Sequence, residues 1–227
     1  MWGEFIECAS RPMSSDPKSF KETPWHREHR EQYERIHKDF DAISGRIEEI
    51  VRAGIKPGRA DTSLLKMQRG KVPEGHIFFY GVQDMQNAFL DNFYPCAFTV
   101  DGATYASSEH FYQSRKTGDH ELRAWIIAAP TAAEAKRRGN SLKPGQMTKD
   151  WDTKKIEAMK EALLNKFCYG YSINGEPLRD MLLATGTKKM HEDSPGDKIW
   201  GVEGLDLLGL VLVLTRQSLL IEGFHRS

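Results

Sequence analysis

The sequence predicts a mainly helical α+β fold in which several helices accompany one small β-hairpin or short sheet. Apolar residues recur at intervals of three and four in many segments, which predicts helices. An Asp-Gly pair between two short β-compatible segments predicts the hairpin. The chain has 227 residues, of which 39% are apolar and 28% charged. That length and composition are typical of one compact domain with an additional segment.

The additional segment is expected at residues 1–75. Residues 1–22 are polar and contain prolines and serines, which predicts a loose arm. An amphipathic helix is expected from about residue 24 to residue 53, because Thr23-Pro24 is typical of a helix start and Gly54 of a helix end. We expect the helix to pack on the same chain rather than on a partner, with residues 54–75 as a connector. Its apolar face consists of Tyr33, Ile36, Phe40, Ile43, Ile47 and Ile50.

The main domain is expected at residues 76–227. It begins with a short strand at residues 76–80, and the hairpin follows at residues 98–105 with Asp101-Gly102 as its turn. A serine at position 107 or 108 can cap a helix that continues through residue 116. Further helices are expected near residues 120–128, 131–139, 152–168, 176–184 and 206–221.

The charge balance and the apolar pattern exclude several classes of protein. Basic and acidic side chains number 32 each, so binding to nucleic acid through charge alone is not expected. The longest apolar segment, Leu205 to Leu214, is interrupted by Asp206 and is too short to span a bilayer, so no membrane association is expected. The first ten residues lack the pattern of a secretory signal, so we expect a cytoplasmic protein, with the nucleus as the alternative.

The common motifs for cofactors and metals are missing. The sequence contains no Walker loop, no Gly-x-Gly-x-x-Gly and no Gly-x-Ser-x-Gly motif. The three cysteines include no Cys-x-x-Cys pair, and His26 and His29 have no acidic or cysteine partner motif. We therefore expect neither a metal nor a cofactor.

The segment from Ser107 to Lys116 carries the first set of candidate functional residues. On a helix, Glu109, Gln113 and Lys116 fall on one face, so an acid, an amide and an amine point the same way. This pattern is also found on exposed helix faces that have no catalytic role, and spacing alone favours that second interpretation.

Three further segments combine acids, amides and aromatic rings. Asp197 lies beside Trp200 and Gly201 in a loop rich in proline and glycine, and Trp151 lies between two acids before a helix. The loop Asn92-Phe93-Tyr94 adds an amide and two rings. Together these residues suit a sugar–base substrate, because rings stack on a base, amides hold ribose hydroxyls, and a carboxylate stabilises an oxocarbenium-like centre.

The ordered series of these segments resembles the NADAR (YbiA-like) family of N-glycosidases. The resemblance extends over about residues 77–222 and implies a YbiA-like fold that follows an unrelated N-terminal helical extension. The matching segments include Asn92-Phe93-Tyr94-Pro95, Glu109-His110, Tyr112-Gln113, Lys116, Asp150-Trp151-Asp152, Leu183-Ala184-Thr185-Gly186, Glu192-Asp193-Ser194-Pro195, Trp200-Gly201 and Leu208-Gly209.

The resemblance also implies roles for individual residues. Glu109, Lys116 and Asp197 are expected to be catalytic. Two positions depart from the family pattern, because Asp91 stands where serine is usual and Asp206 stands where asparagine is usual. The substrate-binding residues are expected to be Asn92, Phe93, Tyr94, Gln113, Trp151, Trp200, Gly201 and Asp206.

The expected activity is hydrolysis of the N-glycosidic bond of a ribosylated base. The favoured substrate is ADP-ribosylated guanine, as a nucleoside or in DNA, and the alternative is a phosphoribosylated intermediate of riboflavin biosynthesis. A module that binds ADP-ribose without cleaving it, and an interaction protein that acts through the helix at residues 24–53, are the other hypotheses. Two mechanisms stay open: a Schiff base formed by Lys116, or a carboxylate that acts as general base to water.

Overall fold

The computed structural model describes residue 27 and residues 29–226, apart from residues 70–71 and 85. The arm expected at residues 1–22 and the helix start expected at Thr23-Pro24 lie outside the described residues. The described elements in chain order are α2 (Arg30–Arg52), α3 (Thr62–Arg69), β1 (His76–Phe79), η2 (Ala88–Leu90), β2 (Phe98–Val100), β3 (Ala103–Tyr105), α4 (Ser108–Ser114), α5 (His120–Ile127), α6 (Ala132–Asn140), η3 (Pro144–Gln146), α7 (Trp151–Tyr169), α8 (Leu178–Ala184), β4 (Lys189–Glu192) and α9 (Leu207–Arg226).

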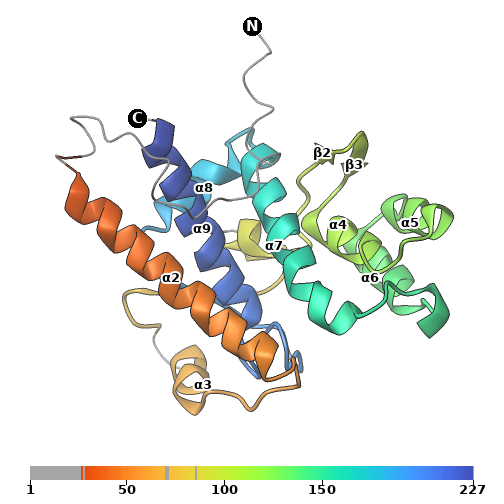
Figure 1. Cartoon of the computed structure of the whole chain (residues 1–227), viewed down its shortest axis with the longest axis horizontal. Coiled ribbons are helices and arrows are strands. Elements are labelled where there is room, and N and C mark those ends of the chain that lie inside the picture. Colours follow the sequence, from red (N-terminus) through yellow and green to blue (C-terminus); the bar gives the residue numbers. More distant parts are fainter. Residues whose placement is uncertain (1–26, 28, 70–71, 85, 227) are drawn as a thin grey trace, which may run out of the picture.

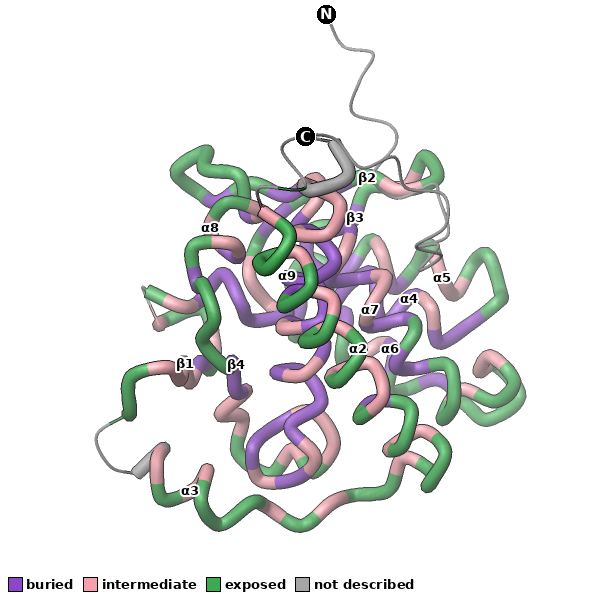
Figure 2. Tube along the Cα trace, turned by 60° about the vertical axis from the view of Figure 1, so that its left-hand side comes forward, coloured by how far each residue is buried: buried purple, intermediate pink, exposed green. Residues whose placement is uncertain are grey.

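The last helix, α9, is the centre of the fold. It contacts α2, α7, α8 and β4, and α2 and α7 lie on either side of it (Figure 1). Buried residues follow one another on most sides of α9 and occupy every position of α4 (Figure 2). A helix that is apolar on most sides is covered by its neighbours, which explains why the apolar segment at residues 205–214 forms core rather than surface.

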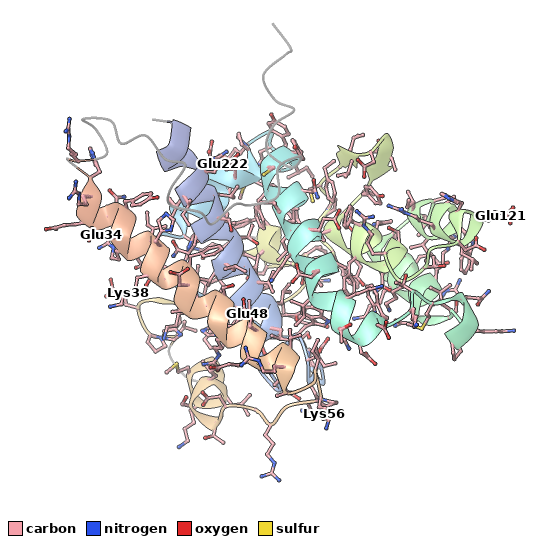
Figure 3. The ribbon with its side chains drawn as sticks, viewed as in Figure 1. Glu34, Lys38, Glu48, Lys56, Glu121 and Glu222 are labelled. Carbon is pink, nitrogen blue, oxygen red and sulfur yellow. The ribbon has the colours of Figure 1, made fainter. Side chains whose placement is uncertain are left out.

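The amphipathic helix of the extension forms as α2 and packs along α9, so the prediction of packing on the same chain is confirmed. Ile36 and Ile47 are buried against the domain. The polar face is turned outward, and Glu34 and Lys38 project from the side of α2 that faces away from α9 (Figure 3). The helix ends before Gly54, which has a φ of 78° that favours glycine.

The connector contains one helix that the sequence analysis did not predict. In α3, the side chain of Asp61 accepts a hydrogen bond of 2.8 Å from the backbone N–H of Ser63, as a helix-capping residue does. The only apolar residues of α3 at suitable spacing are Leu64, Leu65 and Met67, so the helix is too short to show a clear period.

The β structure consists of two separate pairs. The predicted hairpin is confirmed as β2 and β3, and its turn has positive φ at both Asp101 and Gly102, at 50° and 77°. The predicted strand at residues 76–80 is confirmed as β1. It pairs in parallel with β4, which was not predicted because residues 189–192 include no β-branched or aromatic residue.

Candidate active site

The candidate site is built on the short helix α4, which lies inside the domain. Its N-cap is Ser107, whose hydroxyl accepts a hydrogen bond from the backbone N–H of His110. The backbone N–H of Glu109 donates a 3.1 Å hydrogen bond to the carbonyl oxygen of Asn92. The hydroxyl of Ser108 donates to the side-chain oxygen of Asn92 at 3.0 Å. These bonds fix the first turn of α4. All seven residues of the helix are buried, so Glu109 and Gln113 do not lie on an exposed helix face.

Glu109 and Gln113 form the first part of the site. The side-chain amide of Gln113 donates a 2.7 Å hydrogen bond to Oε1 of Glu109, and the two residues are 2% and 4% exposed. Burial raises the pKa of Glu109, and the bond from Gln113 and the charges of Lys136 and Lys116 oppose that shift. A carboxyl group in this setting keeps its proton more readily than an exposed one, as a general acid must.

Lys116 supplies the amine. The pKa of Lys116 is lowered to about 8, mainly by burial; the charges of Lys136 and Lys155 contribute to the lowering, and the charge of Glu109 opposes it. The ammonium nitrogen lies 6.0 Å from the centre of the Tyr112 ring and donates a 2.7 Å hydrogen bond to Oδ1 of Asn140. About one tenth of this amine is therefore uncharged at pH 7, far more than for an exposed lysine, and nucleophilic attack requires the uncharged form.

Two more acids, Glu192 and Asp197, act on these groups through their charges. Burial and the charge of Asp197 raise the pKa of Glu192 to about 8, and Glu109 contributes in the same direction. One carboxylate oxygen of Glu192, Oε2, is buried and has no hydrogen-bond partner among the described residues. We name Glu109, Lys116, Glu192 and Asp197 the acid–amine cluster.

Aromatic rings surround this cluster, with Tyr112 at their centre. The centre of the Tyr112 ring lies 5.4 Å from that of Trp151 and 5.7 Å from that of Trp200, and the indole N–H of Trp200 donates a hydrogen bond to the Tyr112 hydroxyl. Burial and the charges of Glu109 and Asp197 raise the pKa of Tyr112, so its hydroxyl stays protonated. The acid–amine cluster and both indole rings, which come from distant segments, are thus brought together around one tyrosine.

Comparison with known proteins identifies the domain. Residues 78–220 match the family model of the NADAR domain. The chain belongs to the NADAR domain family. Its relatives include an N-glycosidase of Nostoc punctiforme, which is 33% identical over 63% of this chain and 92% of the relative, and the N-glycosidase YbiA of Escherichia coli, which is 34% identical over 64% and 89%.

One further relative and one solved structure complete the comparison. A riboflavin biosynthesis protein of Vibrio vulnificus is 36% identical over 69% of this chain, but the chain spans only 42% of that protein's length. The NMR structure of the E. coli protein YbiA matches with a TM-score of 0.57 and 32% identity, over 67% of this chain and 90% of that one. The expected family and the YbiA-like α+β fold are confirmed. This NADAR protein is an enzyme of its relatives' class, the hydrolases of N-glycosyl bonds.

Several residues expected to bind substrate have structural roles in this NADAR domain. Asn92 uses its side chain to hold α4 and donates to the sulfur of Met159. Tyr94 accepts a hydrogen bond from the backbone N–H of Ile173, and Asp206 bonds to His191 outside the acid–amine cluster. Gly201 is fixed by close packing, because a Cβ atom there would lie 3.1–3.2 Å from three carbonyl oxygens.

Three residues of the NADAR site were not selected from the sequence. Glu192 belongs to an acidic loop that the sequence analysis noted, but its position on a strand was not predicted. Tyr112 lies between Glu109 and Gln113, and an apolar ring on a helix is more often part of a core. Lys136 lies on α6, where its ammonium nitrogen is 5.6 Å from the centre of the Phe93 ring. All three residues are recognised by their proximity in space to the other site residues. That proximity cannot be predicted from the spacing of residues along the chain.

The described part of the NADAR protein contains no group of three or more histidine, cysteine, aspartate or glutamate residues arranged to hold a metal ion. None of its described helices is long and apolar enough to cross a membrane.

Proposed function

We propose that this NADAR protein removes ADP-ribose from ADP-ribosylated guanine by hydrolysing the N-glycosidic bond. The observation that carries the proposal is the acid–amine cluster. A buried lysine with a pKa lowered to about 8 interacts with the charge of the buried Glu109, and its amine lies 6.0 Å from the centre of the Tyr112 ring, which packs against Trp151 and Trp200. A lysine in this setting is suited to form a Schiff base with a sugar, and a buried acid is suited to protonate a leaving base.

The rings and cations around the cluster support a substrate with more than one flat group and with phosphates. Trp151 and Trp200 lie on two sides of Tyr112, and they offer stacking surfaces for a base. Lys136, next to Phe93, adds a cation that can bind a phosphate. ADP-ribose linked to guanine combines two bases and two phosphates and thus uses all of these groups.

The proposed mechanism begins with the neutral amine of Lys116, which attacks C1′ of the ribose. The bond between C1′ and the base nitrogen breaks, and the base leaves with the proton of Glu109. A proton of the attacking nitrogen passes to a carboxylate of the cluster, and the ring oxygen takes a proton as the furanose opens, which leaves a Schiff base at C1′. Water adds to C1′, the bond to Lys116 breaks, and the freed sugar closes its ring.

The rival mechanism uses no covalent bond to the enzyme. A carboxylate of the cluster takes a proton from water, the water attacks C1′, and Lys116 only balances the charge of Glu109. The effect of Glu109, which raises the pKa of Lys116, is consistent with such pairing. Burial is the larger influence and lowers the pKa, which favours the Schiff base.

A phosphoribosylated intermediate of riboflavin biosynthesis is the second candidate substrate. The specific observation in its favour is the Vibrio vulnificus relative, which is named for riboflavin biosynthesis. Such a substrate offers the same ribosyl C1′ to the acid–amine cluster and one phosphate to Lys136. It has fewer flat groups than ADP-ribosylated guanine and leaves part of the aromatic surface unused.

The test is to incubate the purified protein with ADP-ribosylated guanosine and, separately, with a phosphoribosylated riboflavin intermediate. Free ADP-ribose from the first substrate supports the proposal, and turnover of the second alone supports the alternative. Tight binding of ADP-ribose with no turnover of either substrate indicates a binding module. Borohydride added during turnover distinguishes the mechanisms, since only a Schiff base gives a stable sugar adduct on Lys116.

A further inference from the structure

Asn140 is the last residue of α6 and the hydrogen-bond partner of the Lys116 amine. Its side-chain oxygen, Oδ1, accepts the 2.7 Å hydrogen bond from Nζ of Lys116. Lys116 is only 8% exposed, whereas Asn140 is exposed. The bond therefore joins a buried lysine to an amide at the surface, on a different helix from the one that carries the candidate acid.

Both partners of this bond have fixed positions. Helix α6 packs on α4 (Figure 1), and Gly139, next to Asn140, lies so close to Gln113 of α4 that no side chain fits between them. The carbonyl oxygen of Lys116 accepts a 2.6 Å hydrogen bond from the backbone N–H of Thr148. The distance between the amide and the amine is therefore set by the backbone on each side.

An amide is well suited to hold an amine that must lose its proton. The oxygen of an asparagine accepts an N–H group from a neutral amine or from an ammonium ion, and it brings no full charge. A carboxylate at the same distance would favour the ammonium form. Among the described residues no carboxylate forms an ion pair with Lys116. The charged groups that act on its amine from a greater distance are Glu109 of α4, Lys136 of α6 and Lys155 of α7.

The bond also limits the directions in which the neutral amine can react. A neutral amine has two N–H groups and one lone pair. When one N–H group donates to Asn140, the lone pair cannot point at Asn140 and is left for a substrate carbon. Such control of direction matters because reacting atoms must meet in a near-attack geometry.

We propose that Asn140 is a positioning residue for the nucleophile: its amide oxygen orients the amine of Lys116 without the negative charge that would keep the amine protonated. The proposal rests on the role of Lys116 in the proposed N-glycosidase mechanism. A general-base mechanism gives Asn140 no such role.

The first test measures the pKa of Lys116 in the free protein. The signal of its Cε atom is followed against pH by NMR in protein labelled with ¹³C-lysine, and Lys116→Arg assigns the signal. The unaltered protein should give a value of about 8. Asn140→Asp places a carboxylate against the amine and should raise the pKa by about 1–3 pH units.

Ser141→Asp is the matched control for the added charge. Ser141 is exposed, directly follows Asn140, and donates its hydroxyl to the carbonyl oxygen of Arg138. Both variants add a carboxylate at the C-terminal end of α6, where a negative charge is unfavourable, so their effects on stability should be similar. Ser141→Asp should change the pKa of Lys116 far less, because its charge is exposed and screened. The proposal is overturned if Asn140→Asp leaves this pKa unchanged or if Ser141→Asp raises it as much.

The second test compares the turnover of two variants over a range of pH. Asn140→Asp keeps an oxygen acceptor, so its turnover should fall near neutral pH and recover at a pH above the raised pKa. Asn140→Ala removes the acceptor, so its kcat should fall by about 10- to 100-fold at every pH, with little change in KM. Unaltered kcat in Asn140→Ala, or no recovery of Asn140→Asp at high pH, would contradict a positioning role.

The two tests separate this proposal from the proposed function. If the unaltered protein cleaves neither candidate substrate, the proposed N-glycosidase function fails. The NMR titration needs no substrate, so it still shows whether Asn140 holds the amine and controls its charge.

Discussion

The side-chain amide of Gln113 donates a 2.7 Å hydrogen bond to Oε1 of Glu109, one helical turn earlier on α4. The other atom of that amide, Oε1 of Gln113, is buried and lies against Gly139 of α6. The orientation of the candidate general acid thus depends on the absence of a side chain on a neighbouring helix.

Gly139→Ala should therefore reduce activity although residue 139 is outside the acid–amine cluster. The added Cβ would lie 2.0 Å from Oε1 of Gln113, so the amide must move and its bond to Glu109 is lost or distorted. We expect a loss of about 1–3 kcal/mol of stability, as for other overpacked core sites, together with a fall in turnover. Gly118→Ala is the matched control, because nothing lies within 4 Å of its added Cβ, and it should have near-normal turnover. Equal turnover in the two variants would contradict this role of Gly139.

The pH dependence of the protein's stability should reveal the raised pKa of Glu192. Its pKa in the folded protein is about 8, above the ordinary value of 4.5, so the folded protein holds a proton that the unfolded chain releases. Consequently the free energy of unfolding falls as the pH rises from about 4.5 to about 8. In Glu192→Gln this part of the decline should disappear. Urea unfolding at several pH values in that window measures the difference, and parallel curves for the two proteins would exclude the raised pKa.

Turnover should rise as the pH is raised toward 8, because the Schiff-base mechanism requires the neutral amine of Lys116, whose pKa is about 8. Lys116→Arg keeps a positive charge but cannot form the adduct, so its turnover should fall to background. The control Lys160→Arg changes a lysine of α7 that is paired with Glu157 and should retain activity. Substantial turnover by Lys116→Arg would favour the general-base mechanism instead.

Two glycines of the extension should respond to alanine in opposite directions. Gly45 is inside α2 with nothing within 4 Å of an added Cβ, so Gly45→Ala should stabilise the protein by about 0.5–1 kcal/mol through helix propensity. Gly54 has a φ of 78°, so Gly54→Ala should destabilise it. Thermal melts of both variants test this pair, and destabilisation by Gly45→Ala would show that α2 is constrained at that position.

The parts of the fold that were predicted from the sequence are those in which local chemistry and tertiary packing agree. The hairpin has an Asp-Gly turn that favours positive φ, α4 has a serine cap, and α2 has a clear apolar period. By contrast, β4 forms a strand because it pairs with β1. Helix α9 packs tightly on β4, since a Cβ atom at Gly209 would lie 2.0 Å from the carbonyl oxygen of Met190. No local pattern in the sequence predicts these tertiary contacts.

The candidate site was predicted in part for a similar reason. The sequence identified Glu109, Lys116 and Asp197 through the resemblance, and the structure brings them together. It could not identify Glu192, because the position of Glu192 at the end of β4 depends on the pairing of β4 with β1. Asp206 was expected at the substrate, but its carboxylate bonds to the ring of His191 and to the backbone N–H of Glu192.

The most direct test of the central claim measures cleavage of ADP-ribosylated guanosine by three proteins: the unaltered chain, Glu109→Gln and Glu121→Gln. Glu121 is an exposed acid of α5 that lies at the outer edge of the molecule (Figure 3), and it serves as the control. We expect Glu109→Gln to fold normally and to lose about 10²–10⁴-fold in turnover, with Glu121→Gln close to the unaltered protein. Near-normal cleavage by folded Glu109→Gln would contradict the assignment of this site as the N-glycosidase centre.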